Sequence, residues 1–309
     1  MHVEILGTAA GGAFPQWNCA CRNCSRVRSG AFSGRARTQL QVAISSDRVS
    51  WCLLNASPDL RLQIESNSFL HPRGRNRDSP ISSVVLTSAD LDQCLGLLLL
   101  RELQPIEVFV AASIGRILRE DNSMFSMLQR TQGQARWHEI SPGTAFNLFP
   151  GASGQSQIEC LPLTVAMRYP SYVTAERAAQ LEAGEAVLGL ILHAQSGKRL
   201  GYFPAVAEIN PALLDHLESL DVLLFDGTFW TDDELTKIQN GAQTAFQMGH
   251  IPVSSATGSL DLLSKLRCPR KIFVHINNTN PMLDVTGPEY REVRDSGWEI
   301  AEDGCHLEL

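Results

Sequence analysis

Three of the eight cysteines lie within six residues of one another, in a glycine-rich segment close to the N-terminus. Cys19, Cys21 and Cys24 form a C-x-C-x-x-C cluster, in which three thiols cannot all pair with one another. Three thiolates at this spacing can bind one tetrahedral zinc ion at about 2.3 Å, with a fourth ligand from elsewhere. The cluster therefore predicts a structural zinc site, and we expect the fourth ligand in the loop after His275. The alternative is three reduced thiols in a loop, where they would be open to oxidation.

Carboxylates and imidazoles follow short apolar runs elsewhere in the chain. Asp90 and Asp92 come after one such run, Asp226 ends a second, and His275 ends a third. Strand ends are where α/β proteins place their sites, so we expect these groups to share a metal or catalytic pocket. His250 precedes a predicted helix and titrates near neutral pH, which makes it a candidate general acid or base. Taken singly, Asp92 can also be a helix N-cap, and a single histidine is more often structural.

The segment that follows the cysteines is basic, although the chain as a whole is acidic. It carries five arginines and no acidic residue before Asp47, whereas the whole chain has a net charge of −7. Arginine binds carboxylates through paired hydrogen bonds, so such a segment suits a small polyanion. We take Arg22, Arg35 and Arg37 as candidate substrate-binding residues. The alternative is a solvated loop that is merely basic.

The composition is that of a folded globular protein, with 309 residues of which 44% are hydrophobic and 19% charged. The net negative charge argues against nucleic acid and anionic membranes as partners. The longest apolar run, residues 94–100, is far shorter than the roughly 20 residues that span a bilayer. Five further cysteines have apolar neighbours, which indicates a reducing compartment, so we expect a cytoplasmic protein. These are Cys52, Cys94, Cys160, Cys268 and Cys305.

Runs rich in Val, Ile, Leu and Phe predict strands, with helical patterns between some of them. The predicted strands cover residues 2–6, 39–45, 51–56, 83–86, 107–111, 158–165, 187–194, 222–225 and 271–276. The predicted helices cover residues 92–102, 113–129, 211–220 and 253–266, and the loops 7–37, 72–80, 141–143, 151–157 and 279–288. We expect an α/β fold in which helices cover a pair of mixed sheets. It would be one domain over residues 1–309, with similar halves at about 1–168 and 185–309.

Six segments, in order along essentially the whole chain, resemble the pyrroloquinoline quinone (PQQ) biosynthesis protein B family of the metallo-β-lactamase superfold. They read GTAAGGAFPQWNCACRNC, NASPDLR, VVLTSADLDQCLGLLLLRE, FDGTFWTDDEL, MGHIP and FVHINNTNP. The resemblance implies a metallo-β-lactamase-like αββα sandwich, a structural zinc in the cysteine loop, and a role in making the redox cofactor PQQ from a cross-linked glutamate and tyrosine. It also implies an iron-dependent oxygenase that hydroxylates the tyrosine ring of a Glu-Tyr-derived precursor.

The sequence departs from the family's pattern at the implied metal site. The superfold's H-x-H-x-D-H motif falls on residues 88–93, which read SADLDQ, so only Asp92 is in register and a dinuclear zinc hydrolase is not expected. The resemblance implies Asp92, position 93 and His275 as holders of Fe(II) or another divalent metal. Position 93 is Gln93, whose amide oxygen is a poorer ligand for Fe(II) than an imidazole. His275, His250 and a carboxylate are an alternative ligand set.

The sequence leaves three functions open. The first is an oxygenase of PQQ biosynthesis, with His250, Asp226 and Asp90 as candidate catalytic residues. The second is a protein that binds or carries PQQ or its precursor without turnover, which Gln93 favours. A metal-dependent hydrolase of the superfold is least favoured, because the early histidines are missing. We expect a small anionic partner related to PQQ, and the sequence is compatible with a homodimer.

Overall fold

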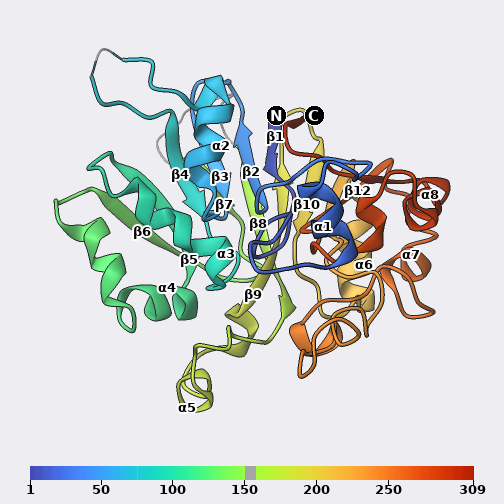
Figure 1. Ribbon diagram of the computed structural model, residues 1–309. Coiled ribbons are helices and arrows are strands. Elements are labelled where there is room, and N and C mark those ends of the chain that lie inside the picture. Colours follow the sequence, from blue (N-terminus) through green and yellow to red (C-terminus); the bar gives the residue numbers. More distant parts are fainter. Residues whose placement is uncertain (75, 150–157) are drawn as a thin grey trace. The chain divides into compact units, whose positions relative to one another are not determined.

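Figure 1 shows the computed structural model of the chain, which describes residues 1–74, 76–149 and 158–309. The chain divides into two compact units. Unit 1 comprises Met1–Leu6, Gln41–Lys198 and Gly304–Leu309, and unit 2 comprises Gly7–Leu40 and Arg199–Asp303. The predicted loop at residues 151–157 lies outside the described residues. The prediction of one domain with two similar halves stays a prediction.

Unit 1 contains a seven-stranded sheet with the strand order β14-β1-β2-β3-β4-β5-β6. β14 pairs antiparallel with β1, as β2 does with β3, whereas β3 to β6 run parallel to one another. Strands β3 to β5 are almost wholly buried and mostly apolar, as expected for parallel strands that are covered on both faces. The strands are β1 (His2–Gly7), β2 (Gln41–Ser45), β3 (Trp51–Leu54), β4 (Ile81–Val85), β5 (Ile106–Ala111), β6 (Ala135–Ile140) and β14 (Cys305–Glu308).

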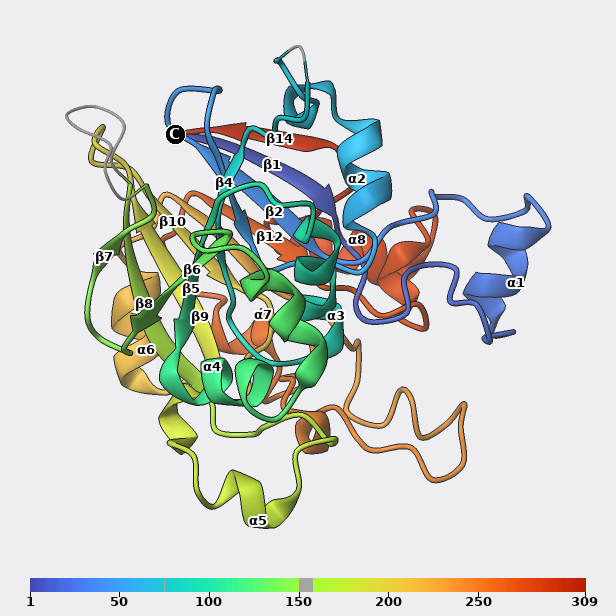
Figure 2. The same ribbon diagram turned by 90° about the vertical axis from the view of Figure 1, so that its left-hand side faces the viewer.

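The rest of unit 1 consists of an antiparallel ribbon and short helices. β8 pairs with β7 on one side and with β9 on the other. Helix α4 packs on β5 and β6 (Figure 2) through the apolar face that carries Ile114, Ile117 and Leu118. The elements are β7 (Phe146–Asn147), β8 (Glu159–Ala166), β9 (Val187–His193), α2 (Leu60–Ser66), α3 (Leu91–Cys94), α4 (Ala112–Arg119) and α5 (Ala175–Ala178).

Unit 2 is built on four parallel strands, β10 to β13. β11 is buried at every position and ends at Asp226. Its register pairs Asp226 with Val274, the residue before His275, which fixes the place of both functional groups. The elements are β10 (Arg199–Phe203), β11 (Val222–Asp226), β12 (Arg270–Val274), β13 (Trp298–Ile300), α1 (Arg22–Arg28), α6 (Pro211–Leu217), α7 (Ser259–Leu262) and α8 (Pro288–Asp295).

Each predicted strand is present, with ends that differ by two residues at most. The predicted helix at 253–266 is largely wrong, because only α7 is helical there. The chain turns sharply before α7, where a Cβ on Gly258 would lie 2.7 Å from both the Val253 carbonyl oxygen and the Ser255 nitrogen. The predicted loop at 7–37 contains α1, whose last turn carries Arg26 and Arg28, as suits the negative end of a helix dipole.

The predicted helices at 92–102 and 113–129 each begin as an α-helix and continue as 3-10 helix, at Leu95–Leu100 and Ser123–Gln129. None of the eight cysteines, all of which the structure describes, forms a disulfide, and Cys52, Cys94 and Cys160 are fully buried. Among the described residues, no helix has both the length and the apolar character that crossing a membrane requires.

Candidate functional site

A carboxylate and two imidazoles meet at the carboxyl ends of two neighbouring strands of unit 2. Asp226 ends β11 and His275 directly follows β12, so the parallel register of the two strands brings them together. His250 comes from the loop before α7, and its Nδ1 lies 2.8 Å from Asp226 Oδ2. The His250 and His275 rings stack, with centroids 5.4 Å apart. Three residues that the sequence singled out therefore lie in one cluster, called here the Asp–His cluster.

Thr228 links the members of the Asp–His cluster, and the sequence analysis missed it. Its N–H and its hydroxyl donate to Asp226 Oδ1 at 3.0 and 2.7 Å. The same hydroxyl oxygen lies 2.7 Å from His275 Nδ1 and 3.1 Å from His250 Nδ1. A threonine two residues after an aspartate often marks a turn that the aspartate side chain stabilises, and this pattern could have indicated the role of Thr228.

Asp226 is a buried carboxylate with many donors around it. Its side chain is fully buried, and Oδ2 accepts the Val206 N–H at 2.9 Å in addition to its contact with His250. Burial alone would raise the pKa of Asp226, but the neighbouring His250 and His275 rings and the hydrogen bonds together lower that pKa below its usual range. The group is therefore charged at neutral pH and can hold a proton on His250 Nδ1.

The Asp–His cluster can support two kinds of chemistry. The potential ligand atoms of Asp226, His250 and His275 lie within 4.8 Å of one another. Two imidazoles and one carboxylate are typical of non-haem iron sites, which keep further positions open. A carboxylate that orients an imidazole is also the usual arrangement for general acid–base catalysis.

The three clustered cysteines meet the loop after β12, also within unit 2. The Cys19, Cys21 and Cys24 sulfurs lie within 4.8 Å of one another. The side-chain amide of Asn278 reaches all three, with Nδ2 at 3.1 Å from Cys19 Sγ, 3.3 Å from Cys24 Sγ and 3.7 Å from Cys21 Sγ. A tetrahedron with bonds of about 2.3 Å has edges of about 3.8 Å, so the amide stands near its fourth corner. Asn23 holds the Asn278 carbonyl oxygen from α1 at 3.2 Å.

The protonation of the thiols differs within the cysteine cluster. Burial raises the pKa of the Cys21 thiol to about 11. Burial acts on Cys19 in the same direction, but hydrogen bonds from the Cys21 N–H and from neighbouring side chains outweigh it and lower the Cys19 pKa. Zinc binds thiolates, so it must displace the proton of Cys21.

The arginines of the basic segment have different surroundings. Arg37 is buried and donates to the Ala301 carbonyl oxygen and to the Thr8 hydroxyl, at 3.2 Å from the latter. Arg22 and Arg35 are exposed. The binding role of all three arginines stays a prediction.

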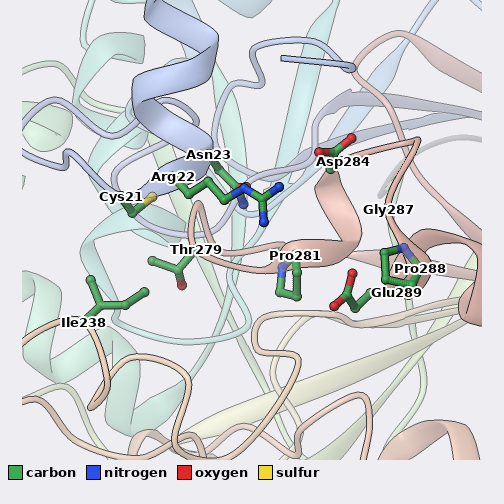
Figure 3. A pocket seen from close by; sticks show the side chains of 10 residues that line it. All are labelled: Cys21, Arg22, Asn23, Ile238, Thr279, Pro281, Asp284, Gly287, Pro288 and Glu289. Atoms are coloured by element: carbon green, nitrogen blue, oxygen red, sulfur yellow. The ribbon is translucent and has the colours of Figure 1, made fainter. Parts of the chain in front are cut away.

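Arg22 lines a cavity of about 250 Å³ next to the cysteine cluster. Figure 3 shows its guanidinium between the Cys21 end of the cavity and Asp284. Arg26 forms an ion pair with Asp284. The ten residues that line the cavity are Cys21, Arg22, Asn23, Ile238, Thr279, Pro281, Asp284, Gly287, Pro288 and Glu289.

The residues after β4 form a separate polar cluster in unit 1. Asp90 precedes α3, and one of its oxygens accepts the Ser88 hydroxyl at 2.8 Å. Asp92 is half-buried in the first turn of α3, and Gln93 is buried there. Because Asp92 and Gln93 belong to unit 1 and His275 to unit 2, a metal site shared by these three residues stays a prediction.

Comparison with known proteins identifies the superfamily to which the chain belongs. Residues 50–276 match the model of the β-lactamase superfamily domain, which is the superfold expected from the sequence. The crystal structure of Zn(2+)-bound PqqB from Methylobacterium extorquens superposes with a TM-score of 0.91 at 39% identity, over 100% of both chains. The chain therefore has the metallo-β-lactamase-like αββα fold.

Two curated relatives define the family within that class. A coenzyme PQQ synthesis protein B from Acinetobacter baumannii (strain ACICU) is 38% identical over 309 residues, and one from Pseudomonas aeruginosa (strain UCBPP-PA14) is 39% identical over 310 residues. Both alignments cover 100% of each chain. The chain belongs to the coenzyme PQQ synthesis protein B family.

Proposed function

We propose that the chain acts in PQQ synthesis by hydroxylating the tyrosine ring of a Glu-Tyr-derived precursor, with a divalent metal, Fe(II) in the first place, held by the Asp–His cluster. The observation that carries the proposal is the grouping of Asp226, His250 and His275 within 4.8 Å. Two imidazoles and one carboxylate fit Fe(II) and leave room for further ligands. The relative from Methylobacterium extorquens, described as Zn(2+)-bound, supports a divalent ion in this family.

A bound iron would supply the activation of dioxygen. Hydroxylation inserts one oxygen atom into a ring C–H bond and reduces the other to water, so a two-electron reductant is also consumed. The chain's own residues prepare the site. Before metal binds, Asp226 is charged and fixes the His250 ring through Nδ1, while the Thr228 hydroxyl lies 2.7 Å from His275 Nδ1. These contacts set the orientation of both rings before any ligand arrives. A metal held by Asp226 and the two imidazoles would take the place of the protons in these contacts, whereas the Val206 and Thr228 N–H groups would still hold the carboxylate.

We also propose that the cysteine cluster binds one structural zinc ion, with Asn278 as the fourth ligand. The three sulfurs and the amide have the mutual spacing of a zinc tetrahedron. An amide oxygen can replace the amide nitrogen by a flip about the terminal bond of Asn278. The ion would join α1 to the loop after β12.

The test is anaerobic loading with Fe(II), followed by measurement of oxygen uptake and product with a Glu-Tyr peptide and a reductant. Iron content and turnover should both fall in His250→Ala and His275→Ala. His216→Ala removes a histidine from α6 in the same unit and serves as the matched control, with no change expected. Full iron binding in both cluster variants would refute the assignment of the Asp–His cluster.

A second candidate, a non-catalytic protein that binds or carries PQQ or its precursor, is favoured by one observation. The residue at the position where the family pattern implies an imidazole is Gln93, and its amide oxygen already accepts hydrogen bonds from Asn55 and Thr87. Binding of PQQ to iron-loaded protein without oxygen uptake would favour this candidate. For either function we propose that the protein acts in the cytoplasm. We also propose a homodimer, which a measurement of the molar mass in solution would test.

A further inference from the structure

Gln93 is fixed in one orientation by a chain of hydrogen bonds in unit 1. The Thr87 backbone N–H can only donate, and it lies 2.8 Å from the Asn55 side-chain oxygen. This contact fixes the Asn55 amide, whose Nδ2 must then face Gln93, at 3.0 Å from Oε1. Asn55 has a φ of +67°, which asparagine tolerates better than most residues. The orientation of the Gln93 amide therefore follows from a backbone donor that cannot reverse.

The oxygen of Gln93 has no lone pair left for a metal ion. It accepts Asn55 Nδ2 at 3.0 Å and the Thr87 hydroxyl at 2.6 Å. The single Thr87 hydroxyl proton also has Asn55 Oδ1 within reach, at 3.0 Å, but Gln93 Oε1 is the nearer acceptor, and Asn55 Oδ1 already accepts the Thr87 N–H. Ser88 Oγ is also near, at 3.3 Å, but lies closer to the Asp90 carboxylate, at 2.8 Å. A carbonyl oxygen has two lone pairs, and two donors fill them. Ligation of a metal by Gln93 would leave buried donors of Asn55 and Thr87 unpaired, which is costly.

The nitrogen of Gln93 is the part of the side chain that remains available. Nε2 has no acceptor among the described residues, and yet it is not one of the fully buried polar atoms that lack a partner. The residue is only 4% exposed, and this nitrogen contributes to the small accessible area. It points two N–H donors away from the Asn55–Thr87 network.

We propose that Gln93 binds no metal in this chain and instead donates hydrogen bonds from Nε2 to an oxygen of the ligand, a carboxylate or a quinone carbonyl. The inference rests on the proposed function for the identity of that ligand. Hydrogen bonds from Nε2 to an anionic ligand would offset part of the repulsion that the neighbouring carboxylates of Asp90 and Asp92 exert on it. Gln93 is thus a specificity-determining residue.

The experiment compares PQQ affinity and metal content in folded variants of the full chain. Gln93→Glu keeps the shape and replaces the donor by a second oxygen, and Gln93→Met removes both polar atoms at similar length. Gln134→Glu is the matched control, because Gln134 is a buried amide of unit 1 that donates to the Arg101 carbonyl oxygen. Binding of PQQ is measured by equilibrium dialysis, iron by metal analysis after anaerobic loading, and folding by circular dichroism.

Loss of a hydrogen bond to a charged group should weaken PQQ binding at least about tenfold in Gln93→Glu and Gln93→Met. Gln134→Glu should bind PQQ as the wild type does, and the iron content of Gln93→Met should equal that of the wild type. Loss of iron in folded Gln93→Met would overturn the proposal by showing that Gln93 is a ligand. Unchanged PQQ affinity in folded Gln93→Glu would overturn the donor role alone. A wild type that binds no PQQ would overturn the donor role together with the proposed function.

Discussion

Replacing Asp226 by asparagine should destabilise the protein strongly, although the two side chains have the same shape. Each carboxylate oxygen faces a backbone donor that cannot reverse: Oδ1 accepts the Thr228 N–H at 3.0 Å and Oδ2 accepts the Val206 N–H at 2.9 Å. Whichever way an asparagine turns, its NH₂ group meets one of these N–H groups. One hydrogen bond to a charged acceptor is lost and one buried N–H is left unpaired. We expect a cost of about 2–4 kcal/mol.

The cost can be measured by urea unfolding at neutral pH, with equal metal content in all samples. Asp303→Asn is the matched control, because Asp303 is a half-buried carboxylate of unit 2 that also accepts a backbone N–H. Its Oδ1 accepts the Thr8 hydroxyl, at 2.7 Å, and a hydroxyl can also accept, so an asparagine amide can donate there while its oxygen accepts the Thr38 N–H. Because the control also removes a negative charge that acts on the buried Arg37, we expect it to cost about 1–2 kcal/mol, less than Asp226→Asn. Equal costs for the two variants would refute the argument from backbone donors.

The remaining predictions concern three other positions. Burial raises the pKa of Glu234 to about 7. Between the usual pKa of 4.5 and this raised value, the folded form therefore binds a proton that the unfolded form has lost. The free energy of unfolding should fall as the pH rises from about 4.5 to about 7, by an amount on the order of 3 kcal/mol. A stability profile of Glu234→Gln should lack this fall; its persistence would exclude Glu234 as the source. Asn278→Ala should lower the affinity for zinc, and Cys21→Ser should abolish tight zinc binding. Both affinities can be measured by competition with a chelating dye. Equal zinc affinity of Asn278→Ala and the wild type would contradict the role of Asn278 as fourth ligand. Gly96→Ala should unfold unit 1 or lower the free energy of unfolding by more than about 3 kcal/mol, because its methyl group would overlap the Ser57 carbonyl oxygen. A melting temperature within a few degrees of the wild-type value would contradict this prediction.

The buried part of the fold could be predicted from the sequence, whereas edge strands and short helices could not. β11 is apolar up to Asp226 and β12 is apolar over residues 272–274, so their pattern identifies them. β6 and β14 carry charged and half-exposed side chains, and both lie at an edge of their sheet, where burial does not impose an apolar pattern. Helix α1 reads RNCSRVR, which has no apolar stripe, and its position depends on contacts with the distant loop after β12.

The site likewise contains residues that the local sequence identifies and residues that only contacts with distant parts of the chain identify. Asp226 and His275 could be placed at strand ends because each follows an apolar run. Asn278 and Thr228 could not be identified with the same ease, since amides and hydroxyls are common in loops and only the register of β11 and β12 brings them to the sulfurs and imidazoles. The orientation of the Gln93 amide depends on Asn55, which is 38 residues away in sequence.

The loop after β12 carries both His275 and Asn278, so the two clusters of unit 2 share one short piece of backbone. Asn280 ties that piece further to the Gly227 carbonyl oxygen, at 3.0 Å. If the cysteines hold zinc, as proposed, a chelator that is strong enough to strip it should therefore also disturb the position of His275 in the other cluster. On the proposed assignment of iron to the Asp–His cluster, apoprotein made with such a chelator should take up iron poorly, although Asp226, His250 and His275 are all unchanged. Samples for reconstitution should be depleted of iron under conditions that retain zinc, and the zinc content should be reported beside every iron measurement.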